Sequence, residues 1–155
     1  MELTTFGAVL GFAIEQERAA SQLYAEASRD PRSGGLAALF SEAATEKRAH
    51  VGWLERSRRE QVAEMILVPI SDLRDEAFLP SPPTDLERSQ ILDRMIDREE
   101  AAHRFYRVAA QRIGLPEVAK LLERIAGRTA SRRLVLEQGR APFGAGGPGR
   151  HPDRR

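Results

Sequence analysis

Apolar residues recur at alternating three- and four-residue steps through four long stretches of the chain. This spacing is typical of amphipathic helices that bury one stripe. Asp30–Gly35, with one proline and two glycines, separates the first two stretches, and four prolines between Leu67 and Pro83 argue against a regular helix there. A capping box at Thr84–Glu87 opens the third helix. The pattern predicts helices over about residues 5–29, 36–65, 84–114 and 116–138.

The two halves of the chain repeat each other. A shift of 82 residues aligns residues 13–56 with residues 95–138 without a gap, and 11 of the 44 aligned positions are identical. Chance similarity of two amphipathic hairpins would explain matched alanines and leucines, but explains poorly a glutamate followed seven residues later by a tyrosine in both halves. Those matched pairs are Glu17 with Glu99 and Tyr24 with Tyr106. Two repeated helical hairpins joined by a long proline-rich crossover predict an all-α four-helix bundle.

Each predicted helix carries polar residues in the middle of its buried stripe. In chain order they are Glu17, Lys47 with His50, Glu99, and Thr129 with Arg132. A buried carboxylate is costly unless it has a partner or takes up a proton. We therefore expect these side chains to meet in one layer of the bundle, with Tyr24 and Tyr106 one layer away. In the alternative, a small helix rotation places the two glutamates on a solvated rim.

Composition excludes several kinds of chemistry. The 155 residues contain no cysteine, which excludes disulfides, cysteine-ligated zinc, iron–sulfur clusters and a thiol nucleophile. The net charge of +1 gives no reason to expect nucleic acid or an anionic membrane as a partner. No apolar run approaches the roughly 20 residues of a membrane span, and no signal peptide is evident, so we expect a cytoplasmic protein.

The length suits one domain. We expect the bundle to occupy residues 1–138. Residues 139–155 are rich in glycine, proline and arginine and have few apolar groups, which predicts a mobile tail.

The Glu–Tyr pairs and the segment Leu39–His50 resemble the ferritin-like superfamily, and in particular rubrerythrin-type domains, over about residues 6–138. In that family the second helix carries Glu-x-x-His, whose two side chains share a helix face and bind one iron pair. The resemblance implies a ferritin-like bundle. It also implies a di-iron centre that oxidises ferrous iron or reduces peroxide, and a homodimer formed through helices.

The sequence departs from the family pattern at three ligand positions. Lys47 stands where the second helix has glutamate, and Thr129 and Arg132 stand where the fourth has glutamate and histidine. The family ligands that remain are Glu17, His50 and Glu99, with Glu46, Glu100 and His103 as further candidates. Because Lys47 and Arg132 are cations, we expect them to pair with the core carboxylates and replace the metal by salt bridges. We do not expect a di-iron centre.

Two functions are compatible with this pattern. The first is a ferritin-like protein without di-iron chemistry, which has a structural, binding or regulatory role and no catalytic residue. The alternative is a non-haem iron oxidoreductase that keeps a single iron or manganese at Glu17, His50 and Glu99. It would need an external redox partner, since the chain has no cysteine-bound electron donor. A plain helical adaptor would leave the matched Glu–Tyr pairs unexplained.

Overall fold

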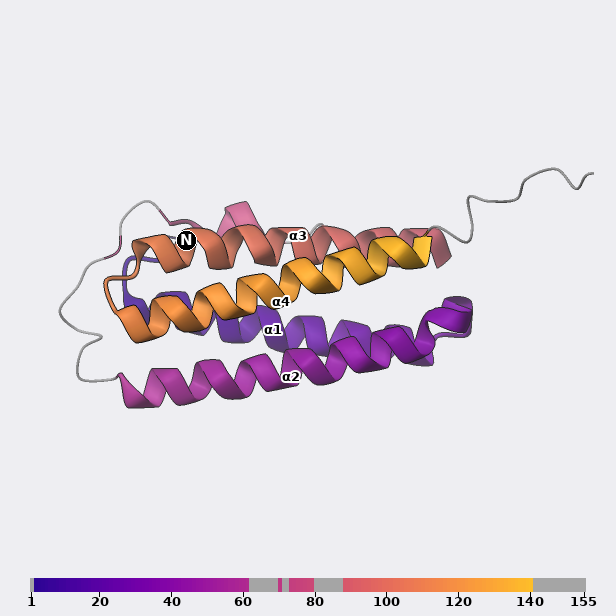
Figure 1. The fold of residues 1–155 in the computed structure, drawn as a ribbon, viewed down its shortest axis with the longest axis horizontal. Helices are drawn as coiled ribbons and strands as arrows, with labels where there is room; N and C mark the ends of the chain where they lie inside the picture. The colour runs from indigo at the N-terminus through magenta and orange to yellow at the C-terminus, as the bar shows by residue number, and fades with distance from the viewer. Residues whose placement is uncertain (1, 62–69, 71–72, 80–87, 141–155) are drawn as a thin grey trace, which may run out of the picture.

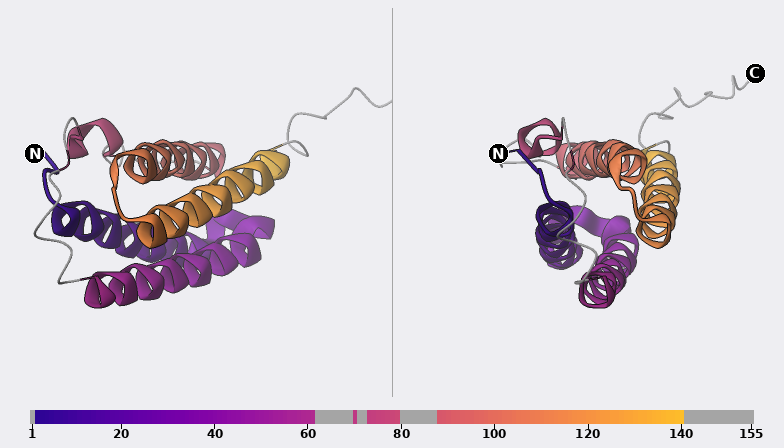
Figure 2. Two further views of the ribbon diagram at one scale, coloured as in Figure 1. Left: turned by 60° about the vertical axis from the view of Figure 1, so that its left-hand side comes forward. Right: turned by 90° about the vertical axis from the view of Figure 1, so that its left-hand side faces the viewer.

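The computed structural model describes residues 2–61, 70, 73–79 and 88–140 and contains four long helices (Figure 1). They are α1 (Phe6–Arg29), α2 (Ala37–Glu60), α3 (Arg88–Arg112) and α4 (Pro116–Arg140). Helix α1 packs against α2 and α3 against α4, and the end-on view in Figure 2 shows the two hairpins closing into one bundle. The prediction of an all-α four-helix bundle is confirmed.

The helix ends differ from the sequence prediction in three places. Helix α3 ends at Arg112, two residues before its predicted end at residue 114. Helix α2 ends at Glu60 rather than near Met65. Leu54, near this end, belongs to the same apolar cluster as Phe6 at the start of α1. Helix α4 continues to Arg140, two residues beyond its predicted end, and Arg140 pairs with Asp93 of α3. The predicted capping box at 84–87 and the tail beyond residue 140 lie outside the described residues.

The first hairpin is closed by a compact turn. Residues Pro31–Leu36 form the 3₁₀ segment η1, which is kinked at Gly34, in place of an irregular loop. Asp30 caps it by accepting a hydrogen bond from the Arg32 amide at 2.9 Å. Gly34 has a φ of 51°, a conformation that favours glycine. This turn directs α2 back along α1, so that residues near the middle of the two helices face each other.

The described part of the crossover is tied to the N-terminal segment. The Leu3 amide donates to the Leu73 carbonyl at 2.7 Å, and the Ile70 amide donates to the Thr4 carbonyl at 2.9 Å. A short 3₁₀ helix, η2 (Asp75–Phe78), follows. Its Phe78 ring packs edge-on against Phe105 of α3, with ring centroids 5.3 Å apart. The described crossover residues are therefore held both by the segment before α1 and by α3.

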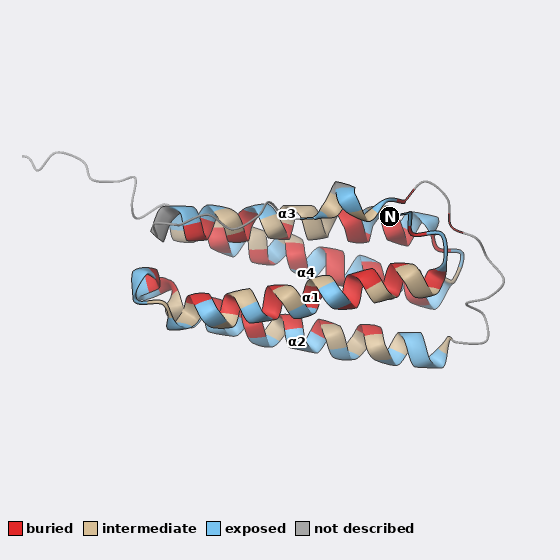
Figure 3. Cartoon of the chain, turned by 180° about the vertical axis from the view of Figure 1, so that it is seen from behind, coloured by how far each residue is buried: buried red, intermediate tan, exposed pale blue. Residues whose placement is uncertain are grey.

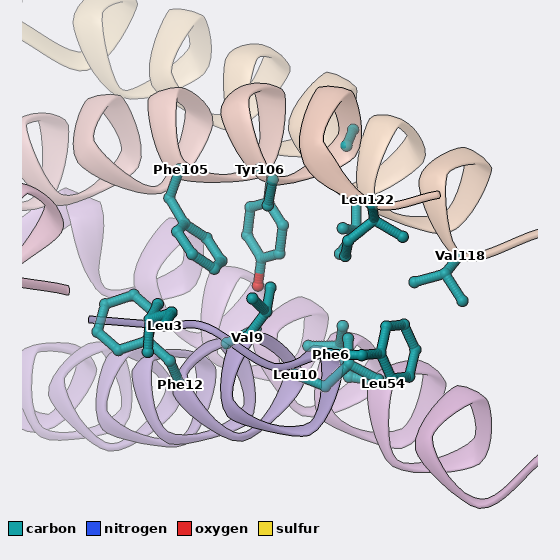
Figure 4. Packing of buried hydrophobic residues seen from close by; sticks show 14 of the residues in the cluster. Leu3, Phe6, Val9, Leu10, Phe12, Leu54, Phe105, Tyr106, Val118 and Leu122 are labelled. Carbon is teal, nitrogen blue, oxygen red and sulfur yellow. The ribbon is translucent and has the colours of Figure 1, made fainter. Parts of the chain in front are cut away.

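Buried positions lie on the faces that the helices turn toward one another (Figure 3). They form two apolar clusters. One includes Phe6, Leu54 and Phe105, and Figure 4 shows Phe105 and Tyr106 pointing from α3 toward α1. The other includes Phe40 and Leu136 near the opposite end of the bundle. The buried polar side chains lie between these clusters. No helix in the described part of the chain is both long and apolar enough to cross a bilayer.

Candidate functional site

The bundle brings the predicted polar layer together in its interior. Each of the four helices contributes buried polar side chains at mid-length: Glu17, Lys47, His50, Glu99, Thr129 and Arg132. They are buried because each occupies a core position of an amphipathic helix. The alternative in which the two glutamates sit on a solvated rim is wrong, since Glu17 is only 2% and Glu99 1% exposed.

The Lys47 ammonium lies between the two core carboxylates. Its Nζ is 2.8 Å from Glu99 Oε2 and 4.0 Å from Glu17 Oε2. Lys47 is 1% exposed, so this contact is shielded from water. Lys47, and not the neighbouring Glu46, is therefore the α2 residue that enters the core at this level.

Two tyrosines complete the carboxylate contacts in a crossed pattern. Tyr24 of α1 donates its hydroxyl to Glu99 Oε1 of α3 at 2.7 Å. Tyr106 of α3 donates to Glu17 Oε1 of α1 at 2.8 Å. Each repeat thus supplies the tyrosine that binds the glutamate of the other repeat. The crossed contacts join the two hairpins through their buried polar groups.

His50 provides the remaining hydrogen-bond donor to the two carboxylates. Its Nδ1 lies 3.0 Å from Glu17 Oε2, and because a carboxylate only accepts, Nδ1 is the donor. Each oxygen of Glu17 and Glu99 then has a donor from a tyrosine, His50 or Lys47. The other ring nitrogen, Nε2, is buried without a hydrogen-bond partner. The carboxylates are therefore satisfied by side chains of this chain alone.

The charges stabilise one another despite their burial. Burial alone raises the pKa of Glu17, but Lys47, His50 and Tyr106 together hold that pKa below its ordinary value. Burial likewise lowers the pKa of Lys47, yet Glu99 and Glu17 raise it above the ordinary lysine value. Burial and the adjacent carboxylates raise the pKa of both tyrosines well above 10, so the hydroxyls keep their protons. At neutral pH the layer holds an ion pair network with neutral phenols.

Arg132 pairs with different acids from those the sequence suggested. The expectation was a contact with Glu17 and Glu99. In the structure its guanidinium lies 3.2 Å from Glu46 Oε2 and 3.8 Å from Glu42 Oε1, both on α2. Arginine has a long apolar stem, so a core position of its Cα still allows the charged head to reach the bundle surface. Thr129, one turn earlier, donates its hydroxyl to the Ala126 carbonyl of its own helix at 2.8 Å.

The other candidate ligands lie outside the layer. Glu100 faces Arg133 of α4 at 3.6 Å. His103 Nδ1 donates to the Ala126 carbonyl at 2.9 Å. Glu46 is engaged with Arg132 as described. None of the three reaches the carboxylate pair in the geometry of this fold.

The structure adds a pocket that the sequence reasoning missed. It lies between α1 and α3 beside the Lys47–Glu99 pair, and Gln16, Ala20, Phe78 and Arg98 are among its lining residues. Arg98 and Gln16 occupy the same position in the two repeats, since their numbers differ by 82. That alignment was the available signal in the sequence, but neither residue lies on the traced core stripes.

The side chains present do not fit a di-iron centre. Such a centre in this fold class uses carboxylates and histidines from all four helices. Here α4 offers a threonine and an arginine, and α2 places an ammonium between the remaining carboxylates. Within the described residues, no group of three or more acidic, histidine or cysteine side chains has the geometry to hold a metal ion.

Comparison with known proteins places the chain in a family. A family model described as rubrerythrin matches residues 8–128, which include Glu17, Lys47, His50 and Glu99. Neither the curated proteins nor the solved structures give a match. The match covers most of the chain and agrees with the helical bundle and with the repeated Glu–Tyr pairs. The chain belongs to the rubrerythrin family.

Proposed function

We propose that this chain is a rubrerythrin-family protein in which the Lys47 ammonium takes the place of the metal, so that its role is structural, binding or regulatory rather than catalytic. The observation that carries the proposal is the position of Lys47 Nζ, 2.8 Å from Glu99 and 4.0 Å from Glu17. Family members use a divalent metal pair to balance core carboxylates, and here a protonated amine supplies positive charge at that level.

Electrostatics support the exclusion of a metal while Lys47 is protonated. An ammonium about 4 Å from a divalent cation repels it by several kcal/mol at an intermediate dielectric constant. The raised pKa of Lys47 means that loss of its proton does not relieve this repulsion at neutral pH. A metal would also have to displace the tyrosine and histidine donors from Glu17 and Glu99. Metal binding therefore opposes several contacts that already stabilise the fold.

The residues at the two ligand positions of α4 also argue against metal binding. Thr129 uses its hydroxyl within its own helix, and Arg132 directs its charge to Glu46 and Glu42. Neither side chain provides an anionic or imidazole ligand toward the carboxylates. The competing function is an oxidoreductase with one metal at Glu17, His50 and Glu99. It would have to bind that metal without a ligand from α4.

Thermal unfolding under anaerobic titration with Fe²⁺ or Mn²⁺ separates the two functions. A ligand at 100 times its Kd stabilises a folded protein by about 2.7 kcal/mol, which raises the midpoint of a domain of this size by roughly 5–10 °C. We expect no such rise with either metal.

Glu17→Gln and Glu26→Gln give a matched pair of variants on α1, because Glu17 is buried in the layer and Glu26 is exposed. A rise in the unfolding midpoint that Glu17→Gln abolishes and Glu26→Gln retains would overturn the proposal in favour of the metal-binding oxidoreductase.

A further inference from the structure

Two arginines of α3 each have an unpaired nitrogen in the described part of the chain. Arg94 and Arg98 lie one helical turn apart and are half-buried. The Nε atom of each is buried and has no hydrogen-bond partner. Among the acids beside them on α3, Asp93 pairs with Arg140, Glu100 with Arg133 and Glu99 with Lys47. No ion pair within the described residues joins Asp97 to either arginine. A partly buried guanidinium without an acceptor is a costly arrangement that an anion would relieve.

Arg98 lines the pocket between α1 and α3. Gln16, its counterpart in the first repeat, lines the same pocket from α1. Three alanines that leave the space open and three aromatic rings also line it: Ala20, Ala101, Ala102, Phe78, Phe105 and Tyr106. The centre of a water molecule can move within about 30 Å³ of the pocket. This is room for a ligand of a few heavy atoms and excludes a large cofactor.

The residues that line the pocket carry two charges of each sign. Glu17 and Glu99 contribute two negative charges and Lys47 and Arg98 two positive charges, while Arg94 lies one helical turn from Arg98 on α3. The oxygens of both glutamates already accept hydrogen bonds from other side chains, and neither glutamate accepts one from Arg98 Nε. The pKa of the Arg98 guanidinium is lowered by burial and then by the like charge of Arg94, and the opposing effects of Tyr24, Glu99 and Glu17 do not cancel this lowering. A further anion beside Arg98 would stabilise its charged form.

We propose that Arg98 and Gln16, supported by the charge of Arg94, bind a small carboxylate such as formate or acetate in this pocket. A guanidinium presents two parallel N–H groups that match the two oxygens of a carboxylate. The Gln16 amide supplies a further N–H donor from the facing helix. The alanine and phenylalanine walls accommodate a hydrogen or methyl substituent. The site goes beyond the proposed function and does not depend on whether a metal binds.

Side-chain ¹⁵N NMR of the arginines tests the proposal on the full chain. Sodium chloride is replaced stepwise by sodium formate at constant ionic strength. We expect a saturable shift of the Arg98 Nε–Hε resonance. Arg98→Gln should weaken formate binding at least about tenfold, because it removes a charge-assisted hydrogen bond. Arg104→Gln, an exposed arginine on the same helix, should bind formate as the wild type does.

A second variant locates the anion without removing charge. Ala102→Leu fills the pocket while Arg94 and Arg98 remain, and we expect it to lose formate binding and keep its helical circular dichroism. Unsaturable shifts in the wild type, or equal formate affinity in the wild type and Arg98→Gln, would overturn the proposal. Wild-type affinity in a folded Ala102→Leu protein would overturn it as well, because the anion would then bind outside the pocket.

Discussion

Lys47→Met will lower the thermal unfolding midpoint by roughly 10 °C, because removing one partner of a buried ion pair costs about 3–5 kcal/mol. Methionine has a similar length and fills the space, so the change isolates the charge. Glu17 and Glu99 would then face each other in the core without the ammonium that lies 2.8 Å from Glu99. One of them must take up a proton or repel the other. Calorimetry at neutral pH measures the effect.

The chain provides a matched control for this variant. It contains two lysines, and the second, Lys120, is exposed on α4. Lys120→Met removes the same charge and should change stability by no more than about 0.5 kcal/mol. The double variant Lys47→Met/Glu99→Gln should recover part of the lost stability, because it also removes one of the two buried carboxylates that lose the ammonium. Equal unfolding midpoints for Lys47→Met and Lys120→Met would show that the Lys47 contact contributes no stability.

Restoring the family's three missing ligands should restore metal binding. The triple variant Lys47→Glu/Thr129→Glu/Arg132→His supplies carboxylates on α2 and α4 and an imidazole on α4. We expect it to bind about two iron ions per chain, the number that a complete set of carboxylates and histidines on four helices holds. The substitution at Arg132 frees Glu46 and Glu42, which are exposed enough to be hydrated. Metal analysis after anaerobic loading and desalting measures the gain.

The double variant Thr129→Glu/Arg132→His is the informative control, because it keeps Lys47. If the ammonium blocks the metal position, this variant should bind far less iron than the triple variant. Equal iron contents in the double and triple variants would mean that the missing α4 ligands, and not Lys47, prevent metal binding. That result would contradict the proposal that the Lys47 ammonium keeps the metal out.

Much of the fold follows from local pattern. Helices α1 and α4 begin within one residue of their predicted starts, because a threonine cap and a helix-starting proline are local signals. Helix α2 ends at Glu60, five residues before its predicted end, and no proline or glycine lies near that position to mark it in the sequence. The burial of Glu17 and Glu99 was also predictable, because each interrupts an apolar stripe and the repeat places both at one depth.

The hydrogen-bond and ion-pair partners within the site are harder to predict from the sequence. The crossed contacts of Tyr24 with Glu99 and Tyr106 with Glu17 depend on how two separate hairpins dock, which periodicity within a helix does not describe. Arg132 was placed correctly on the core face, but its guanidinium reaches Glu46 at 3.2 Å instead of the core carboxylates. A helical pattern fixes the direction of Cβ and leaves a long side chain several destinations.

The metal content of the purified protein tests the central claim most directly. The chain is expressed in iron-supplemented medium, purified without chelator and analysed by mass spectrometry for iron, manganese and zinc. Replacement of the metal by the Lys47 ammonium predicts fewer than about 0.1 metal ions per chain, because carboxylates that pair with the ammonium are not available as metal ligands. A content close to one iron or manganese per chain, lost in Glu17→Gln and kept in Glu26→Gln, would contradict it.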